Sequence, residues 1–122
     1  MPYSGRCHCS AIQFEIDDLP AELTECNCTF CIRRGGLLGY YKPEQFRLKT
    51  ARDRVSTYQW GDFIGQHHHC SICGISVYSE FPSFDDGKAD FERMRVVVNI
   101  RLVDDTAWES LPVKKINGRQ DW

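Results

Sequence analysis

Short runs of alternating apolar and polar residues dominate the chain and predict strands. Residues 11–16 (Ala-Ile-Gln-Phe-Glu-Ile) alternate as a strand with one buried face does, and the Asp-Asp-Leu-Pro sequence that follows ends this strand. Further strand-like runs, each bounded by Gly, Pro or Asp, occupy residues 37–41, 46–49, 55–60, 75–80 and 95–102. The pattern therefore predicts a mainly β fold built from antiparallel sheets.

Helical patterns are scarce and short. Residues 43–46 begin with Pro-Glu, which suits a single helical turn better than a long helix. Residues 84–88 contain Asp-Gly, a strong turn signal, so we expect a turn or exposed loop there, with a mobile segment over residues 83–90. Residues 111–122 mix Pro, Lys, Asn and Gly and favour no element.

The length of the chain limits it to one hydrophobic core. With 122 residues and no linker or repeat, the sequence predicts a single domain over residues 1–122. No apolar run approaches the roughly 20 residues of a membrane helix, so we expect no membrane span. The first cysteine comes before any apolar stretch typical of a secretory signal, which favours a cytoplasmic location.

The charge balance argues against nucleic acid as a partner. The chain has fifteen Lys and Arg residues and seventeen Asp and Glu residues, which gives a net charge of -2 and a pI near 6.1. A phosphate backbone is attracted by an excess of positive charge, and this chain has none.

Cysteine is the residue type that points most clearly to chemistry. The chain holds seven cysteines in three groups, and their odd number in a reducing compartment favours metal binding or catalysis over disulfides. The groups are Cys7 with Cys9, then Cys26 with Cys28 and Cys31, then Cys70 with Cys73.

The first and last groups together predict a structural zinc site. Cys70 and Cys73 have the spacing at which a tight turn points two sulfurs at one metal, and Gly74 follows where positive φ is often needed. A structural zinc takes four ligands, and Cys7 with Cys9 can supply the other two. Four thiolates also suit iron, so the identity of the metal stays open at this point.

The middle group predicts an open site. Cys26, Cys28 and Cys31 offer three ligands, and a zinc held by three protein ligands keeps a position for water or substrate. A soft thiol is a fitting fourth ligand, and zinc would hold it as a nucleophilic thiolate. The alternative is a protein with one zinc, in which these three thiols are buried or redox active.

Basic and imidazole side chains near the cysteines are candidates for supporting roles. Arg33 and Arg34 follow the middle group, where a guanidinium would offset the charge of a zinc–thiolate cluster or bind a carboxylate. In a strand over residues 67–69, His67 and His69 share one face and His68 the other, so the three do not converge on one metal. We expect them to be ordinary strand residues.

These motifs resemble the glutathione-dependent formaldehyde-activating enzyme family, which includes the centromere protein V-like proteins. Residues 5–15 (GRCHCSAIQFE) resemble its opening G-x-C-x-C-G-x-x-x-F-E, residues 26–31 its C-x-C-S-x-C, and residues 70–74 its C-x-x-C-G. Residues 98–102 (VNIRL) are similar to its later V-N-[VI]-R segment. The chain departs from the family pattern with Ser10 in place of a usual Gly and with Ile32 where many members carry a basic residue.

The resemblance implies a fold and an activity. The implied fold is a β-tent of antiparallel sheets held by zinc, with two zinc ions per chain. It places a structural zinc on Cys7, Cys9, Cys70 and Cys73 and a catalytic one on Cys26, Cys28 and Cys31. The implied activity is that of a carbon–sulfur lyase, in which the thiol of glutathione adds to formaldehyde or a related small aldehyde. Arg33 and Arg34 are then the expected glutathione contacts. The alternative is a non-catalytic zinc-binding β-domain for protein interaction or for thiol and zinc handling.

Overall fold

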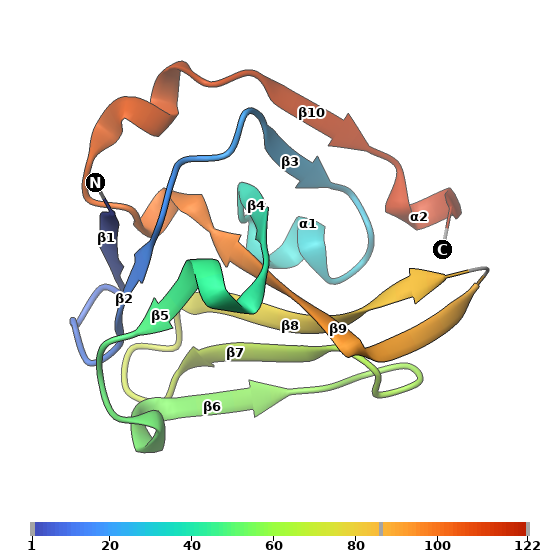
Figure 1. Ribbon diagram of the computed structural model, residues 1–122, viewed down its shortest axis with the longest axis horizontal. Coiled ribbons are helices and arrows are strands. Elements are labelled where there is room, and N and C mark those ends of the chain that lie inside the picture. Colours follow the sequence, from blue (N-terminus) through green and yellow to red (C-terminus); the bar gives the residue numbers. More distant parts are fainter. Residues whose placement is uncertain (1, 86, 122) are drawn as a thin grey trace.

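The alternating segments form strands that pair into two sheets (Figure 1). The computed structural model describes residues 2–85 and 87–121. Within these residues the strands form one three-stranded sheet and one seven-stranded sheet, and every helix is short. The mainly β fold that the sequence predicts is therefore confirmed.

The smaller sheet contains the strand predicted most clearly by alternation. Its order is β1 (Tyr3–Arg6), β2 (Gln13–Ile16) and β5 (Phe46–Leu48), all antiparallel. Phe14 of β2 is 1% exposed and lies opposite Gly5 of β1. A Cβ at Gly5 would come within 2.2 Å of the Phe14 ring, so the close pairing of these strands requires glycine there.

The larger sheet carries cysteines of both predicted sites, since Cys26 and Cys70 are each the last residue of one of its strands. Its strands lie in the order β10-β3-β4-β9-β8-β7-β6, and neighbours are antiparallel except for the parallel pair β10 and β3. In chain order they are β3 (Leu23–Cys26), β4 (Leu38–Tyr41), β6 (Val55–Tyr58), β7 (Gln66–Cys70), β8 (Ser76–Asp85), β9 (Lys88–Asn99) and β10 (Val113–Ile116).

The helices are one or two turns long. The helical turn expected at residues 43–46 is confirmed as a 3-10 turn over Pro43–Gln45, with Pro at its first position. Among the described residues, no helix has the length and apolar character needed to cross a membrane. The α-helices are α1 (Cys31–Arg34) and α2 (Gly118–Asp121), and further 3-10 turns cover Arg52–Arg54, Ile100–Leu102 and Thr106–Ser110.

The loop expected over residues 83–90 is wrong, because β8 and β9 continue through it as a long hairpin. The Asp-Gly turn signal itself is confirmed, since Gly87 lies between the paired residues Asp85 and Lys88 with φ of +77°. Phe84 pairs with Ala89, beyond an irregularity at Pro82 and Ser83. Asp86, part of the expected loop, lies outside the described residues.

Two predicted strands also end early. The strand expected over 95–102 stops at Asn99, whose side chain accepts a hydrogen bond from Arg101 N and so caps the turn Ile100–Leu102. The strand expected over 55–60 ends at Tyr58.

The central strand β9 is buried on both faces of the sheet at residues 96–98, near its end. Val96 and Val98 pack in the hydrophobic core with Phe14 and Ile100, and all four are at most 4% exposed. Val97 points to the opposite face and lines a pocket. Residues 96–98 of β9 therefore contribute to the core on one face of the sheet and line the pocket on the other.

Candidate functional site

Four cysteines from distant parts of the chain converge where the two sheets meet. Cys7 follows β1 of the smaller sheet and Cys70 ends β7 of the larger one, and the Sγ atoms of Cys7, Cys9, Cys70 and Cys73 all lie within 4.8 Å of one another. Cys9 Sγ is 3.7 Å from Cys7 Sγ and 3.5 Å from Cys70 Sγ. Tetrahedral zinc with Zn–S bonds of about 2.3 Å holds its sulfurs roughly 3.8 Å apart. The donor set fits such an ion, as the sequence predicts.

Two similar turns present these sulfurs. Cys7 N donates to Ile12 O at 3.1 Å, and Cys70 N donates to Ile75 O at 3.0 Å, so each pair of cysteines lies in a closed turn. Gly74 follows Cys73 with φ of +79°, the conformation that the sequence predicts for it.

The equivalent position in the first turn is occupied by a residue with a side chain. Ser10 follows Cys9 with φ of +67°. Left-handed backbone costs a residue other than glycine about 1–2 kcal/mol, so the departure from glycine at this position is a local strain that the turn tolerates.

Backbone donors make part of the four-cysteine cluster acidic. Burial opposes ionisation of Cys73, but hydrogen bonds from backbone N–H groups, that of Ile75 first, lower the pKa of its thiol to about 6. The pKa of Cys70 is also below its usual value, because N–H groups of Cys73 and Ile72 outweigh its burial. Thiolate is the form that binds zinc, so these donors favour metal binding at neutral pH.

The remaining three cysteines form a second cluster, the cysteine trio, with Sγ atoms within 4.8 Å of one another. Cys26 ends β3, Cys28 lies in the following turn, and Cys31 begins α1. Cys28 N donates to Cys26 Sγ at 3.4 Å and Cys31 N donates to Cys28 Sγ at 3.2 Å. Backbone N–H groups of this segment thus hydrogen bond to two of the three sulfurs. The spacing of the sulfurs fits one metal ion whose fourth coordination position is open.

The trio thiols differ in acidity. Burial raises the pKa of Cys28, but hydrogen bonds from N–H of Cys31 and from neighbouring groups lower it below its usual value overall. Burial raises the pKa of Cys31 to about 12, although the Arg34 guanidinium acts in the opposite direction. Binding of a metal to all three sulfurs therefore has to release at least the proton of Cys31 at neutral pH.

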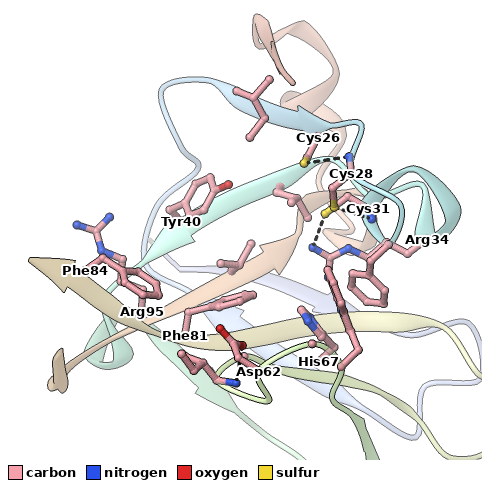
Figure 2. Close-up of a pocket in the computed structure, with 18 residues that line it drawn as sticks. Cys26, Cys28, Cys31, Arg34, Tyr40, Asp62, His67, Phe81, Phe84 and Arg95 are labelled. Carbon is pink, nitrogen blue, oxygen red and sulfur yellow. Dashed lines mark hydrogen bonds between the residues drawn. The ribbon is translucent and has the colours of Figure 1, made fainter. Parts of the chain in front are cut away.

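A pocket of about 580 Å³ opens beside the trio (Figure 2). All three trio cysteines line it, whereas the four-cysteine cluster does not. The walls are mainly apolar and include Trp60, Phe81 and Phe84. This volume falls in the range of about 300–1,000 Å³ found for small-molecule sites.

A chain of hydrogen bonds runs from the trio to a buried histidine. The Arg34 guanidinium donates to Cys31 Sγ at 3.5 Å and to Ser79 Oγ at 3.0 Å, and Ser79 Oγ lies 2.9 Å from His67 Nδ1. Arginine only donates, so Ser79 accepts from Arg34, and the same hydroxyl links the guanidinium to the imidazole of His67. Burial, together with the charge of Arg34, lowers the pKa of His67 to about 4.

The structure separates the two candidate arginines. Arg34 lines the pocket, whereas Arg33 donates to Thr29 O at 2.8 Å and is exposed. The glutathione contacts expected of Arg33 and Arg34 stay predictions.

The histidines are separated as well. His67 lines the pocket, but His68 lies on the other face of β7, where it contacts Thr57 and Glu80 at 2.8 Å each. His69 follows an irregularity in β7 and does not line the pocket.

Sequence reasoning missed two charged residues of the pocket. Asp62 follows β6 and Arg95 lies in β9, and neither is near a cysteine in the sequence. Asp62 had one signal, a position beside the aromatic residues Trp60 and Phe63, and Arg95 had none. The structure brings Tyr40, Trp60, Phe81 and Phe84 to the pocket and places Tyr41 in the core.

Comparisons with known proteins agree with this arrangement. A family model described as glutathione-dependent formaldehyde-activating enzyme matches residues 2–114. No curated protein matches the chain. Among solved structures, the crystal structure of a Rhodobacter sphaeroides protein superposes with a TM-score of 0.71 at 23% identity, covering 91% of this chain and 99% of that one. At this identity the superposition shows a shared fold. The family match confirms the resemblance, and the chain belongs to the glutathione-dependent formaldehyde-activating enzyme family.

Proposed function

We propose that the protein is a zinc-dependent carbon–sulfur lyase that reversibly adds the thiol of glutathione to formaldehyde or a related small aldehyde. One observation carries this proposal: three thiols and a guanidinium lie together at a pocket large enough for a thiol and a carbonyl compound. Membership of the family supports the choice of glutathione and formaldehyde.

The proposal assigns a zinc ion to each cysteine cluster. Cys7, Cys9, Cys70 and Cys73 would hold a structural ion, because their four sulfurs complete a tetrahedral set. Cys26, Cys28 and Cys31 would hold a catalytic and more labile one, since three ligands bind less firmly than four. Zinc bound to the trio would lower the pKa of a thiol ligand and keep it as the thiolate nucleophile.

Arg34 supplies positive charge in the proposed reaction, whereas the proton of the product does not come from His67. Three thiolates around Zn²⁺ carry a net charge of -1 before an anionic substrate arrives, and the Arg34 guanidinium at Cys31 offsets it. The same positive charge stabilises the alkoxide that forms when sulfur attacks the carbonyl carbon. With a pKa of about 4, His67 is neutral at pH 7 and does not supply a proton to the alkoxide. The product oxygen takes its proton from solvent, which completes the addition.

The proposed function is tested by following the exchange between glutathione, formaldehyde and S-hydroxymethylglutathione by NMR with zinc-loaded protein. The reaction also runs without protein, so the protein-free rate is subtracted. We expect a rate that rises in proportion to protein concentration. Glutathione binding with no added rate would instead support thiol or zinc handling, and no binding would support the protein-interaction alternative.

Substitution of Arg34 tests the role of its charge. Arg34→Ala is expected to slow the glutathione reaction by about 10- to 100-fold, since hydrogen bonds to charged groups contribute about 1.5–3 kcal/mol. Arg34→Lys keeps the charge and should recover part of the rate. Arg33→Ala, one residue away, should lose less, because Arg33 hydrogen bonds to a carbonyl outside the pocket. Equal losses for the two alanine variants would contradict the role given to Arg34.

A further inference from the structure

The pocket beside the trio is larger and more apolar than formaldehyde requires. Formaldehyde has two heavy atoms, whereas the pocket volume is about 580 Å³. Trp60, Phe81 and Phe84 wall it together with aliphatic side chains. Figure 2 shows Phe84 and Arg95 at the end of the pocket away from the trio, with Phe81 between them and the cysteines. The apolar wall thus extends well beyond the reacting sulfur.

The pocket wall is mostly apolar, with Arg34, Arg95 and Asp62 as its charged residues, so a more polar surface suits the charged groups of glutathione better. Glutathione carries two carboxylates and one ammonium group, and transfer of charges from water to an apolar surface is costly. A second cavity of about 280 Å³ shares Cys26, Cys31 and Ile116 with the pocket. Arg101, Lys115 and Glu25 line it. Two cations and one anion there complement the charges of the tripeptide.

Resting on the proposed function, we propose that the carbonyl substrate carries a ring-sized apolar substituent, which packs in the aromatic pocket while the charged groups of the thiol lie in the basic cavity. The trio stands at the border between the two. The enzyme would then act on thiohemiacetals of aryl or similarly bulky aldehydes in addition to the formaldehyde adduct.

The reaction for this substrate class is the same addition. The thiolate sulfur forms a bond with the carbonyl carbon, the carbon–oxygen π bond breaks, and the oxygen takes one proton. Thiol and aldehyde give one thiohemiacetal, and neither oxidant nor reductant takes part. The substituent is untouched by the chemistry, so its contribution is binding energy alone.

Calorimetric titration of zinc-loaded protein with glutathione, S-methylglutathione and S-benzylglutathione tests the proposal. The two thioethers stand in for the formaldehyde and aryl adducts. S-benzylglutathione should bind on the order of 10-fold more tightly than S-methylglutathione, because burial of the ring removes apolar surface from water. Equal affinities would overturn the apolar subsite while leaving the proposed function intact. Failure of glutathione itself to bind would overturn the proposed function.

Matched variants test which part of the ligand each surface binds. Phe84 and Phe91 are 59% and 63% exposed on the same hairpin, and only Phe84 lines the pocket. Phe84→Ala should weaken the binding of S-benzylglutathione by about fivefold and that of S-methylglutathione by less than twofold. Phe91→Ala should change neither affinity. Equal effects of the two substitutions would overturn the placement of the ring.

The basic cavity has its own control pair on β10. Lys115 lines the cavity and its neighbour Lys114 does not, although both side chains are exposed. Lys115→Ala should weaken the binding of both thioethers equally, by about three- to tenfold, because each carries the same carboxylates. A loss no larger than that of Lys114→Ala would overturn the placement of the tripeptide.

Discussion

Cys28→Ser is expected to lower the zinc content from two ions per chain to one and to remove the catalysed reaction of glutathione with aldehyde. Cys28 is the central member of the trio, accepting a hydrogen bond from Cys31 N, and its pKa is below its usual value. A serine hydroxyl is a far weaker zinc ligand than a thiolate. Two sulfurs would then remain where three are needed to hold the ion.

The measurement is elemental analysis of zinc per chain, repeated after dialysis against glutathione, together with the NMR exchange rate. Wild-type protein should lose zinc from one site to glutathione and keep the other. The variant should retain the fold, because the trio lies outside the main hydrophobic core. A variant that keeps two zinc ions, or full catalysis, would contradict the assignment of the catalytic site.

Cys73→Ser is expected to have the largest effect on stability and to prevent stable folding. The four-cysteine cluster joins the smaller sheet to the larger one, so its ion would add to the hydrophobic core that the two sheets share. Zinc at structural sites contributes apparent binding free energies of about 10–16 kcal/mol, comparable to the entire free energy of unfolding of a domain, about 5–15 kcal/mol.

Far-UV circular dichroism and thermal unfolding, with and without a chelator, measure this effect. His8→Ala is the control, because His8 stands between two of the proposed ligands but is exposed. It should unfold at the wild-type temperature. A Cys73→Ser protein that also unfolds at the wild-type temperature would show that the cluster does not stabilise the fold.

The strands and the cysteine groups are predictable from sequence because both depend on local spacing. Alternation over residues 11–16 indicates the buried face of β2, and the short cysteine spacings give the sets that converge in space. The length of the β8–β9 hairpin was missed for a physical reason. Asp-Gly favours a turn, but the ladder that begins at the buried residues Val96 to Val98 continues beyond the core to the pair Asp85 and Lys88.

The walls of the pocket are not predictable in the same way. Trp60, Phe81 and Phe84 come from separate segments, and a single sequence does not distinguish aromatic residues of a core from those of a pocket. Arg33 and Arg34 are equivalent in sequence, yet the single turn of α1 directs one guanidinium to the trio and the other to a backbone carbonyl. Such differences arise from helical rotation and tertiary packing.

The parallel pairing of β10 with β3 has a consequence for how this protein is handled. Ile116 lies opposite Cys26 in that pair, and Asn27 Nδ2 donates to Asn117 Oδ1 at 3.1 Å, so the last strand braces the segment that carries the trio. The family match ends at residue 114, in the middle of β10. A recombinant fragment trimmed to that boundary would keep every cysteine and still lose the outer support of the trio, so expression vectors for activity assays should extend through the final residue.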